Sequence, residues 1–167
     1  MGLFDFLKAN KSKTETIVAT PPKAGGVYNR RVKVQSVCES NSDGTSRQKI
    51  LSEIYHKKGP FVKNIEIEIQ GSAAKKENCL EVLVNGFCVG EVEDGMSAFI
   101  SARKEDIVSI HSFKVDWTSP LDKDIEDSFY SLENCENMDF YKYRERKIQE
   151  KDREYFAKMK IAVRSKT

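Results

Sequence analysis

The chain has 167 residues, of which 39% are hydrophobic and 32% are charged. This length argues for one domain with extensions, and the composition is too polar for a membrane protein. The 28 Lys and Arg residues against 26 Asp and Glu leave a net charge of only +2, so the overall charge does not indicate a nucleic-acid partner.

Residues 1–26 are expected to be a flexible N-terminal tail and linker. The first seven residues, MGLFDFL, are followed by Lys8, Lys11 and Lys13. The apolar part is too short for a signal peptide, and it admits two interpretations. It is either a short peripheral anchor at a membrane surface, or a tail that is mobile or docks on its own domain or on a neighbour. Pro and Gly pairs in the rest of this segment favour a linker.

A strand followed by a helix is predicted next. Val32 and Val34 alternate with polar residues within 27–38, which is typical of a half-buried strand. After a polar turn, Thr45 and Gln48 fit a capping box, with Thr45 as N-cap and Gln48 at position N3. Apolar residues on one face then predict a helix that ends at Gly59-Pro60.

A strand and a hairpin are predicted from the middle of the chain. The alternation in 62–70 favours a half-buried antiparallel strand, and Asn85-Gly86 predicts a two-residue turn between strands at 79–84 and 87–92. This register places Cys79 opposite Val92 rather than opposite Cys88, so the two sulfur atoms are too far apart to bond. The sequence therefore predicts that all four cysteines are reduced and that the protein is cytoplasmic. The cysteines are Cys38, Cys79, Cys88 and Cys135.

The second half of the chain contains an acidic segment followed by a basic one. A short helix at 94–103 is followed by a strand at 107–117 whose alternation slips, which predicts a bulge near Ser112. Residues 120–139 hold one base against seven acids and no clear period, and we expect a surface loop or an excursion there. Residues 140–167 hold ten bases against four acids, with a helix expected to about Arg153 and a final strand after it.

These elements predict an α+β fold: a small, mostly antiparallel β-barrel or curved sheet of about six or seven strands with two or three short helices. Residues 27–167 would form this domain, with an acidic and helical excursion at 118–153 and a final strand at 154–164. The basic final segment either binds nucleic acid or forms a solvated helix and a strand with one charged face.

Arg47 is the first candidate site residue. A cation in the first turn of a helix opposes the helix dipole by roughly 0.3–1 kcal/mol, so a partner is expected. Arg47 could hold a phosphate together with the backbone amides of Thr45 and Ser46. The alternative is a helix cap in which Arg47 is paired internally.

Lys75 and Lys76 are further candidates, in a polar loop at 71–78. They either contact phosphates without reading bases or belong to a solvated loop. Three aromatic residues are either stacking platforms or core, namely Tyr28, Phe113 and Trp117.

The order of several short motifs resembles the HIRAN domain, including its bacterial members. The motifs are Asn78-x-Leu80-x-Val82, then Asn85-Gly86, then Val89-Gly90-x-Val92 and a short helix, with Asp43-Gly44-Thr45-Ser46-Arg47-Gln48 upstream. The resemblance implies a compact β-barrel, and eukaryotic members of the family bind the free 3′ end of single-stranded DNA. The loop used for this has no aromatic residue and no Asp here, so the end-reading residues are not carried over.

Two functions are predicted as alternatives. The first is a non-catalytic nucleic-acid-binding module with weak binding to the phosphate backbone of single-stranded DNA or another nucleic acid. Its site residues would be Arg47, Lys75, Lys76, Thr45 and Ser46. The second is a protein-interaction or scaffold module that keeps the fold without binding DNA. No catalytic residue is predicted, because His56 and His111 accompany no serine or cysteine motif and the sequence has no glycine-rich phosphate loop. No metal site is predicted, because no two cysteines have the spacing CxxC and neither histidine lies near a cysteine in the sequence. No cofactor is predicted.

Overall fold

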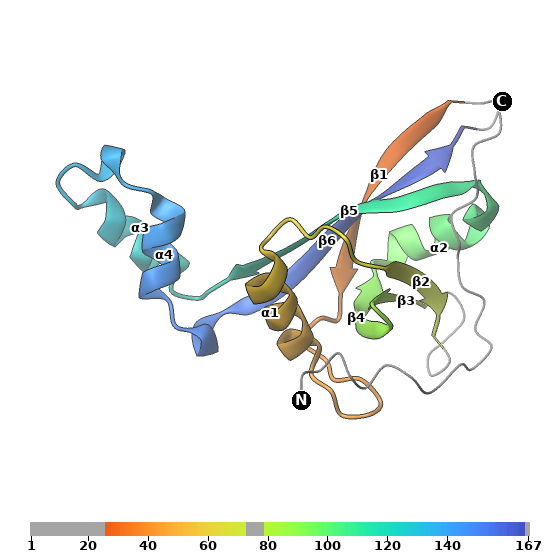
Figure 1. Cartoon of the computed structure of the whole chain (residues 1–167), viewed down its shortest axis with the longest axis horizontal. Coiled ribbons are helices and arrows are strands. Elements are labelled where there is room, and N and C mark those ends of the chain that lie inside the picture. The colour runs from red at the N-terminus through yellow and green to blue at the C-terminus, as the bar shows by residue number, and fades with distance from the viewer. Residues whose placement is uncertain (1–25, 73–78, 166–167) are drawn as a thin grey trace.

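The last strand of the chain lies inside a six-stranded antiparallel sheet (Figure 1). The computed structural model describes residues 26–72 and 79–165, so the predicted tail lies outside the described residues apart from Gly26. The strand order is β2-β3-β4-β1-β6-β5, and every pair is antiparallel. The predicted α+β class with a curved sheet is confirmed. Within the described residues the sheet is not closed into a barrel.

Apart from α3 and three short 3-10 helices, the elements follow the predicted order. The strands are β1 (Val27–Gln35), β2 (Ile67–Gly71), β3 (Leu80–Val84), β4 (Phe87–Val92), β5 (Ile107–Thr118) and β6 (Glu154–Arg164). The α-helices are α1 (Arg47–Lys58), α2 (Asp94–Ala102), α3 (Asp122–Tyr130) and α4 (Phe140–Lys147). Short 3-10 helices are η2 (Lys104–Asp106), η3 (Cys135–Asn137) and η4 (Glu150–Asp152). None of the helices in the described ranges is long and apolar enough to cross a membrane.

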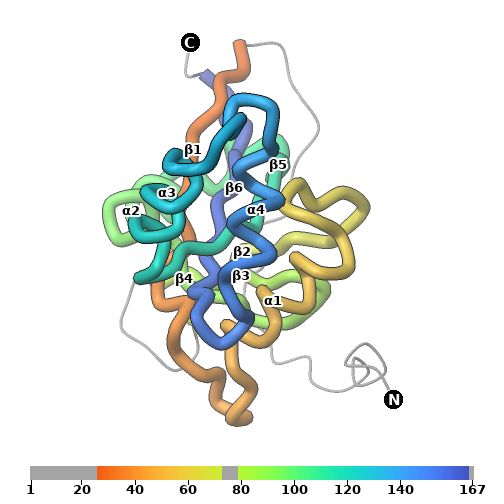
Figure 2. The backbone as a smooth tube through the Cα atoms, turned by 90° about the vertical axis from the view of Figure 1, so that its left-hand side faces the viewer, coloured from red at the N-terminus to blue at the C-terminus, as the bar shows by residue number. Residues whose placement is uncertain are grey.

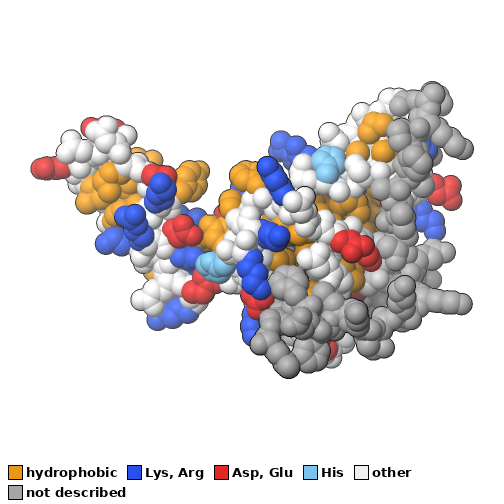
Figure 3. Space-filling model, in the orientation of Figure 1, with side chains coloured by type: hydrophobic (Ala, Val, Ile, Leu, Met, Phe, Trp, Pro, Cys, Tyr) orange, Lys and Arg blue, Asp and Glu red, His pale blue; other side chains and the backbone are white. Residues whose placement is uncertain are grey.

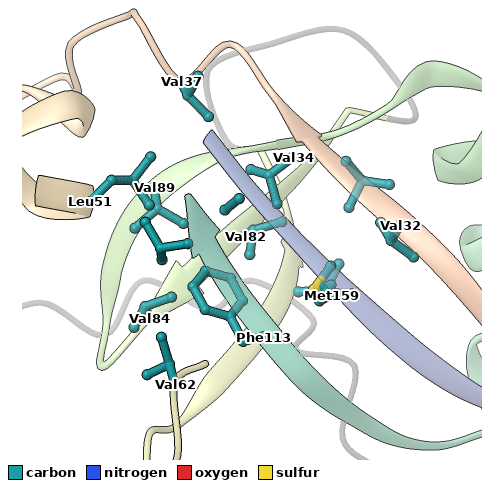
Figure 4. Packing of buried hydrophobic residues seen from close by; sticks show 14 of the residues in the cluster. Val32, Val34, Val37, Leu51, Val62, Val82, Val84, Val89, Phe113 and Met159 are labelled. Atoms are coloured by element: carbon teal, nitrogen blue, oxygen red, sulfur yellow. The ribbon is translucent and has the colours of Figure 1, made fainter. Parts of the chain in front are cut away.

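One hydrophobic core lies between the sheet and α1. Alternate residues of β1, β3, β5 and β6 point into it, and Leu51 of α1 packs against them (Figure 4). Val32, Val82 and Phe113 are among its fully buried members. The alternation that predicted the strands therefore reflects a sheet with one buried face.

The start of α1 corrects the predicted capping box by one residue. The N-cap is Ser46, whose Oγ accepts a hydrogen bond from the Lys49 backbone N at 3.4 Å. Gln48 has a different role, because its amide bonds both backbone groups of Tyr155 in β6, at 2.7 Å each. The register of β1 with β6 stops at Val34 opposite Ala157, so the Gln48 side chain supplies hydrogen bonds where that strand pairing has ended.

The hairpin turn is confirmed, but part of its register was predicted wrongly. Asn85 (φ 49°) and Gly86 (φ 82°) form the turn, and Leu83 lies opposite Cys88. The register then shifts between Val82 and Leu83, so the predicted pairing of Cys79 with Val92 does not form. Gly90 allows the shift, because its φ is 157° and it lies against β1. All four cysteines carry free thiols.

The predicted bulge in β5 is confirmed. The register with β6 shifts between His111 and Lys114, and Ser112 adopts a positive φ of 54°. The outer edge of β5 is partly covered by the chain that leaves α1. Phe61 forms an isolated bridge with Lys114, and the Val62 backbone N donates to the Phe113 carbonyl O at 3.1 Å.

The acidic stretch is an excursion from the sheet, as one of its two interpretations had it, and it contains the helix α3, which no clear period in the sequence had indicated. Helices α3 and α4 form a hairpin that extends beyond the ends of β5 and β6, and we call residues 119–153 the arm (Figures 1 and 2). Phe129 is only 3% exposed, and its ring lies 5.2 Å from those of Phe140 and Tyr143. The sequence gives little sign of this helix, because the face that it buries consists of little more than Ile125 and Phe129. The aromatic residues that pack against Phe129 belong to α4.

Candidate nucleic-acid interface

Arg47 is buried in an internal network, where it is only 4% exposed. Its Nε donates to Asn41 Oδ1 at 2.8 Å, and its Nη1 donates to the Ser36 carbonyl O at 2.9 Å. Nη1 also lies 3.4 Å from Glu91 Oε1 and 3.6 Å from Glu39 Oε2. These contacts are the internal pairing that was the alternative to a phosphate site at this helix start.

The other predicted site residues do not extend a site around Arg47. The Thr45 backbone N donates to Asp43 Oδ1 at 2.8 Å, so this amide is already bonded within the turn. The Ser46 hydroxyl caps α1. Lys75 and Lys76 lie outside the described residues.

The aromatic candidates separate into core and surface. Phe113 and Trp117 are buried and belong to the hydrophobic core. Tyr28 is half-buried and packs against that core. None of the three is therefore an open stacking platform. The exposed aromatic residue on the sheet body is Phe61, which is 69% exposed.

A row of basic side chains crosses three neighbouring strands. Lys33 of β1 lies opposite Lys158 of β6, which lies opposite Lys114 of β5. Phe61 continues this row, because it bridges to Lys114. These positions alternate with buried residues of the same strands, so their side chains belong to the sheet face that points away from the core. Arg31 opposite Lys160 adds a second basic pair.

These residues line a cavity of about 700 Å³. Of the twelve described residues that line it, six are cations and none is a carboxylate. We call this cavity the basic groove, and its cations are Arg31, Lys33, Lys63, Lys114, Lys158 and Lys160. Ser112, the bulge residue of β5, lines it too, so the kink in β5 helps to shape it.

The groove concentrates positive charge, most of which has no nearby carboxylate among the described residues. Among the described residues, only Lys114 of its six cations has a carboxylate within 4.0 Å, which is Asp116 at 2.8 Å. Lys114 Nζ also lies 5.3 Å from the centroid of the Phe61 ring, within range of a cation–π contact. Like charges directly opposite each other weaken strand pairing, so the pairs Arg31–Lys160 and Lys33–Lys158 cost the fold stability.

Sequence reasoning singled out the basic C-terminal segment but not this groove. Lys158 and Lys160 belong to that segment, whereas Lys33 and Lys114 come from strands far away in the sequence. The available signal was the alternation of Lys and Arg with buried residues in two strands. Only the pairing of β1, β6 and β5 shows that the charged positions share a face.

A second polar cluster joins α1 to the start of β6. Glu150 accepts hydrogen bonds from Ser52 Oγ at 2.6 Å and from the Tyr155 hydroxyl at 2.9 Å, and its Oε2 lies 3.0 Å from His56 Nε2. Burial alone would raise the pKa of Glu150, but the bonds from Ser52, Tyr155 and His56 outweigh it and lower the pKa below its ordinary value. Burial raises the pKa of Tyr155. Ser52 donates to the carboxylate and not to His56, so Ser52 and His56 do not form the hydrogen-bonded pair that activates a serine nucleophile.

The described part of the chain contains no group of three or more His, Cys, Asp or Glu residues that could hold a metal ion. Comparison of the whole chain with family models, with curated proteins and with solved structures gives no match. The class of protein to which the chain belongs is therefore described from its fold and its basic groove alone. The chain is an α+β protein whose curved antiparallel sheet carries a basic groove on one face and a helical arm at one end.

Proposed function

We propose that the chain is a non-catalytic module that binds single-stranded nucleic acid in the basic groove. The observation that carries this proposal is the groove lining, with six cations, no carboxylate among the described residues, and an exposed Phe61. Nucleic-acid phosphates would neutralise the like-charge pairs that the fold otherwise tolerates at a cost.

The groove favours an unpaired strand over a duplex. Phe61 offers an open ring face beside the cations, and a ring in this position can stack on a base that is not already stacked in a duplex. Lys33, Lys158 and Lys114 lie in a row and can contact successive phosphates without reading bases. Binding should therefore be weak, indifferent to sequence and strongly dependent on salt.

The assignment to a HIRAN-like domain is part of the proposal and rests on the sequence resemblance. It is supported by the order of the Asn85-Gly86 turn, strand β4 and helix α2, which is the order that the resemblance implies. The free thiols support the cytoplasmic location that we propose. The proposed binding face differs from the predicted one, because it is built from β1, β5 and β6 and not from the start of α1.

A fluorescence-anisotropy titration with a labelled single-stranded DNA at several salt concentrations tests the proposal. The double variant Lys158→Gln, Lys160→Gln should reduce the slope of log affinity against log salt by about 1.4, at about 0.7 per lost phosphate contact. Phe61→Ala should weaken binding about 5- to 100-fold with an unchanged slope, because it removes stacking and no charge.

The matched control is Lys49→Gln, Lys58→Gln, which removes the same charge from exposed positions on α1 that do not line the groove. This control should keep the wild-type slope. Equal losses in the control and in the groove variant would mean that net charge alone drives binding. Absence of binding at low salt would reject the proposal.

A protein-interaction module is the second candidate, and one observation favours it. Of the seven large hydrophobic residues that are exposed in the described part of the chain, five lie in the arm. This surface is separate from the basic groove and shares none of its residues.

A further inference from the structure

The arm carries most of the exposed large hydrophobic residues of the described structure. Its five exposed large hydrophobic residues are Leu121, Tyr130, Leu132, Met138 and Tyr141. Tyr141 is 77% exposed, and the Tyr130 ring stacks on that of Phe140 with 6.4 Å between centroids. In Figure 3, hydrophobic side chains gather on the part of the surface that belongs to the arm, beside clusters of both charges. Clustered apolar side chains on a projecting element are typical of an interaction site.

The two helices of the arm carry equal and opposite charges. Helix α3 holds four acids and one base, a net charge of −3, and α4 holds four bases and one acid, a net charge of +3. The pair Asp122–Arg144, at 2.6 Å, joins the two helices internally. Among the described residues, the other acids of α3 have no cation within 4.0 Å, and they are Asp124, Glu126 and Asp127.

Two cations near the end of α4 also have no ion-pair partner among the described residues. Arg146 and Lys147 have no carboxylate within 4.0 Å in the described structure, although Lys147 Nζ lies 5.5 Å from the Tyr143 ring. The hairpin thus presents unpaired acids on one helix and unpaired bases on the other. A surface of this kind is complementary to itself when it is turned by a two-fold rotation, which is the geometry of most homodimers.

We propose that the arm is a homodimerisation element, in which α3 of one copy packs against α4 of a second copy. The exposed apolar residues would form the centre of the interface, and the unpaired acids of each α3 would face Arg146 and Lys147 of the other copy. The arm extends beyond the ends of β5 and β6, so the second copy can reach it without covering the sheet (Figure 1). A strongly acidic or basic partner would match only one of the two helices, and this favours a second copy.

Sedimentation equilibrium of the full chain, from about 1 to about 100 µM and without nucleic acid, tests the proposal. The wild-type protein should be a dimer whose dissociation constant rises with salt. Variant X, Glu126→Lys with Asp127→Lys, should raise the dissociation constant at least about tenfold. Variant Y, Arg146→Glu with Lys147→Glu, should do the same.

The decisive step is to mix X with Y. In the mixed dimer, each reversed helix faces the reversed helix of the other copy, so both contacts become attractive again and an X–Y dimer should form. One chain that carries all four changes should also dimerise. Tyr141→Ser should weaken the dimer, whereas Phe61→Ser, which removes another strongly exposed aromatic residue but outside the arm, should leave it unchanged.

All the charged positions are exposed, so each variant should keep the wild-type circular dichroism spectrum and melting temperature to within a few degrees. A wild-type protein that stays monomeric at the highest concentration would overturn the proposal. A dimer that X and Y leave intact would also overturn it, as would a mixture of X and Y that fails to associate. Nucleic-acid binding is measured separately, so failure of the dimer does not bear on the basic groove.

Discussion

The guanidinium of Arg144 lies over the ring of Trp117, with its Cζ atom 3.6 Å from the ring centroid. Arg144 also donates to the Trp117 carbonyl O at 3.0 Å and to both carboxylate oxygens of Asp122. One side chain of α4 thereby joins the end of β5 to the first turn of α3. The Arg153 guanidinium is a second cation near this ring, 4.5 Å from the centroid.

Arg144→Lys should loosen the arm from the sheet, because a lysine cannot make the paired bonds to Asp122 or stack flat on the indole ring. Trp117 is the one tryptophan of the chain and is 3% exposed, so its fluorescence reports on this contact directly. We expect a red-shifted emission, faster amide exchange across the arm, and a loss of about 1–3 kcal/mol. Arg146→Lys, which changes an exposed arginine of the same helix, should leave the emission unchanged. An unshifted emission in Arg144→Lys would show that the contact does not fix the arm.

Arg47→Gln should destabilise the fold by about 3–5 kcal/mol, because it removes the cation that lies 3.4 Å from the buried carboxylate of Glu91. Guanidinium denaturation measures this effect. The double variant Arg47→Met, Glu91→Met should recover part of the loss, since it removes both buried charges.

The same variant separates the two interpretations of Arg47. Where circular dichroism shows that Arg47→Gln is folded, its binding to single-stranded DNA should have the wild-type salt dependence. A slope reduced by about one would instead restore Arg47 as a phosphate contact.

Gly90→Ala should destabilise the protein by at least about 2 kcal/mol. A Cβ atom there would lie 2.5 Å from Val34 Cγ1 and 2.6 Å from the Gln35 carbonyl O, and the φ of 157° disfavours any side chain. Gly95→Ala is the matched control. A Cβ atom at Gly95 meets nothing within 4 Å, and its helical position should make alanine neutral or stabilising by about 0.5–1 kcal/mol. Equal melting temperatures for the two variants would contradict the close approach of β4 to β1.

Glu150→Gln should reveal a pH-dependent contribution to stability. The folded-state pKa of Glu150 lies below its ordinary value of 4.5, so its carboxylate stabilises the fold above that pH. This contribution is lost as the pH falls through the lowered pKa. The wild-type protein should therefore melt at a higher temperature than the variant at pH 7, by a small margin because the carboxylate is half-exposed. Thermal melts at decreasing pH should show this margin shrinking below about pH 4.5. A constant margin would mean that the charge of Glu150 contributes nothing.

Features that depend on neighbouring residues were predicted from the sequence. The alternation around Val32, the Asn85-Gly86 turn and the bulge at Ser112 each leave a local pattern, and each is present in the structure. Helix α1 was also predicted, with its end at Gly59, where the chain adopts a positive φ. These elements were sufficient for the fold class.

The remaining features depend on contacts between distant segments. Gln48 fits a capping box locally, yet its partner is Tyr155, 107 positions further along the chain. The position of Arg47 suits an anion, yet Glu91 and Asn41 enclose it. The basic groove also depends on contacts between distant segments. Its cations share one face of the sheet only because β1, β6 and β5 pair, and the local sequence pattern does not specify that pairing.

The position of β6 has a consequence for how the protein folds. Strands β1 and β5 both pair with β6, and Tyr28 of β1 meets Val163 only after all the residues between them have been synthesised. Until then the edges of β1 and β5 that β6 will occupy have open backbone groups, and the core lacks Met159 and Ile161. Such long-range pairing slows folding, because a large loop must close before any contact compensates for it. On the ribosome, the nascent chain must therefore keep the apolar faces of β1 and β5 apart from other chains until β6 emerges.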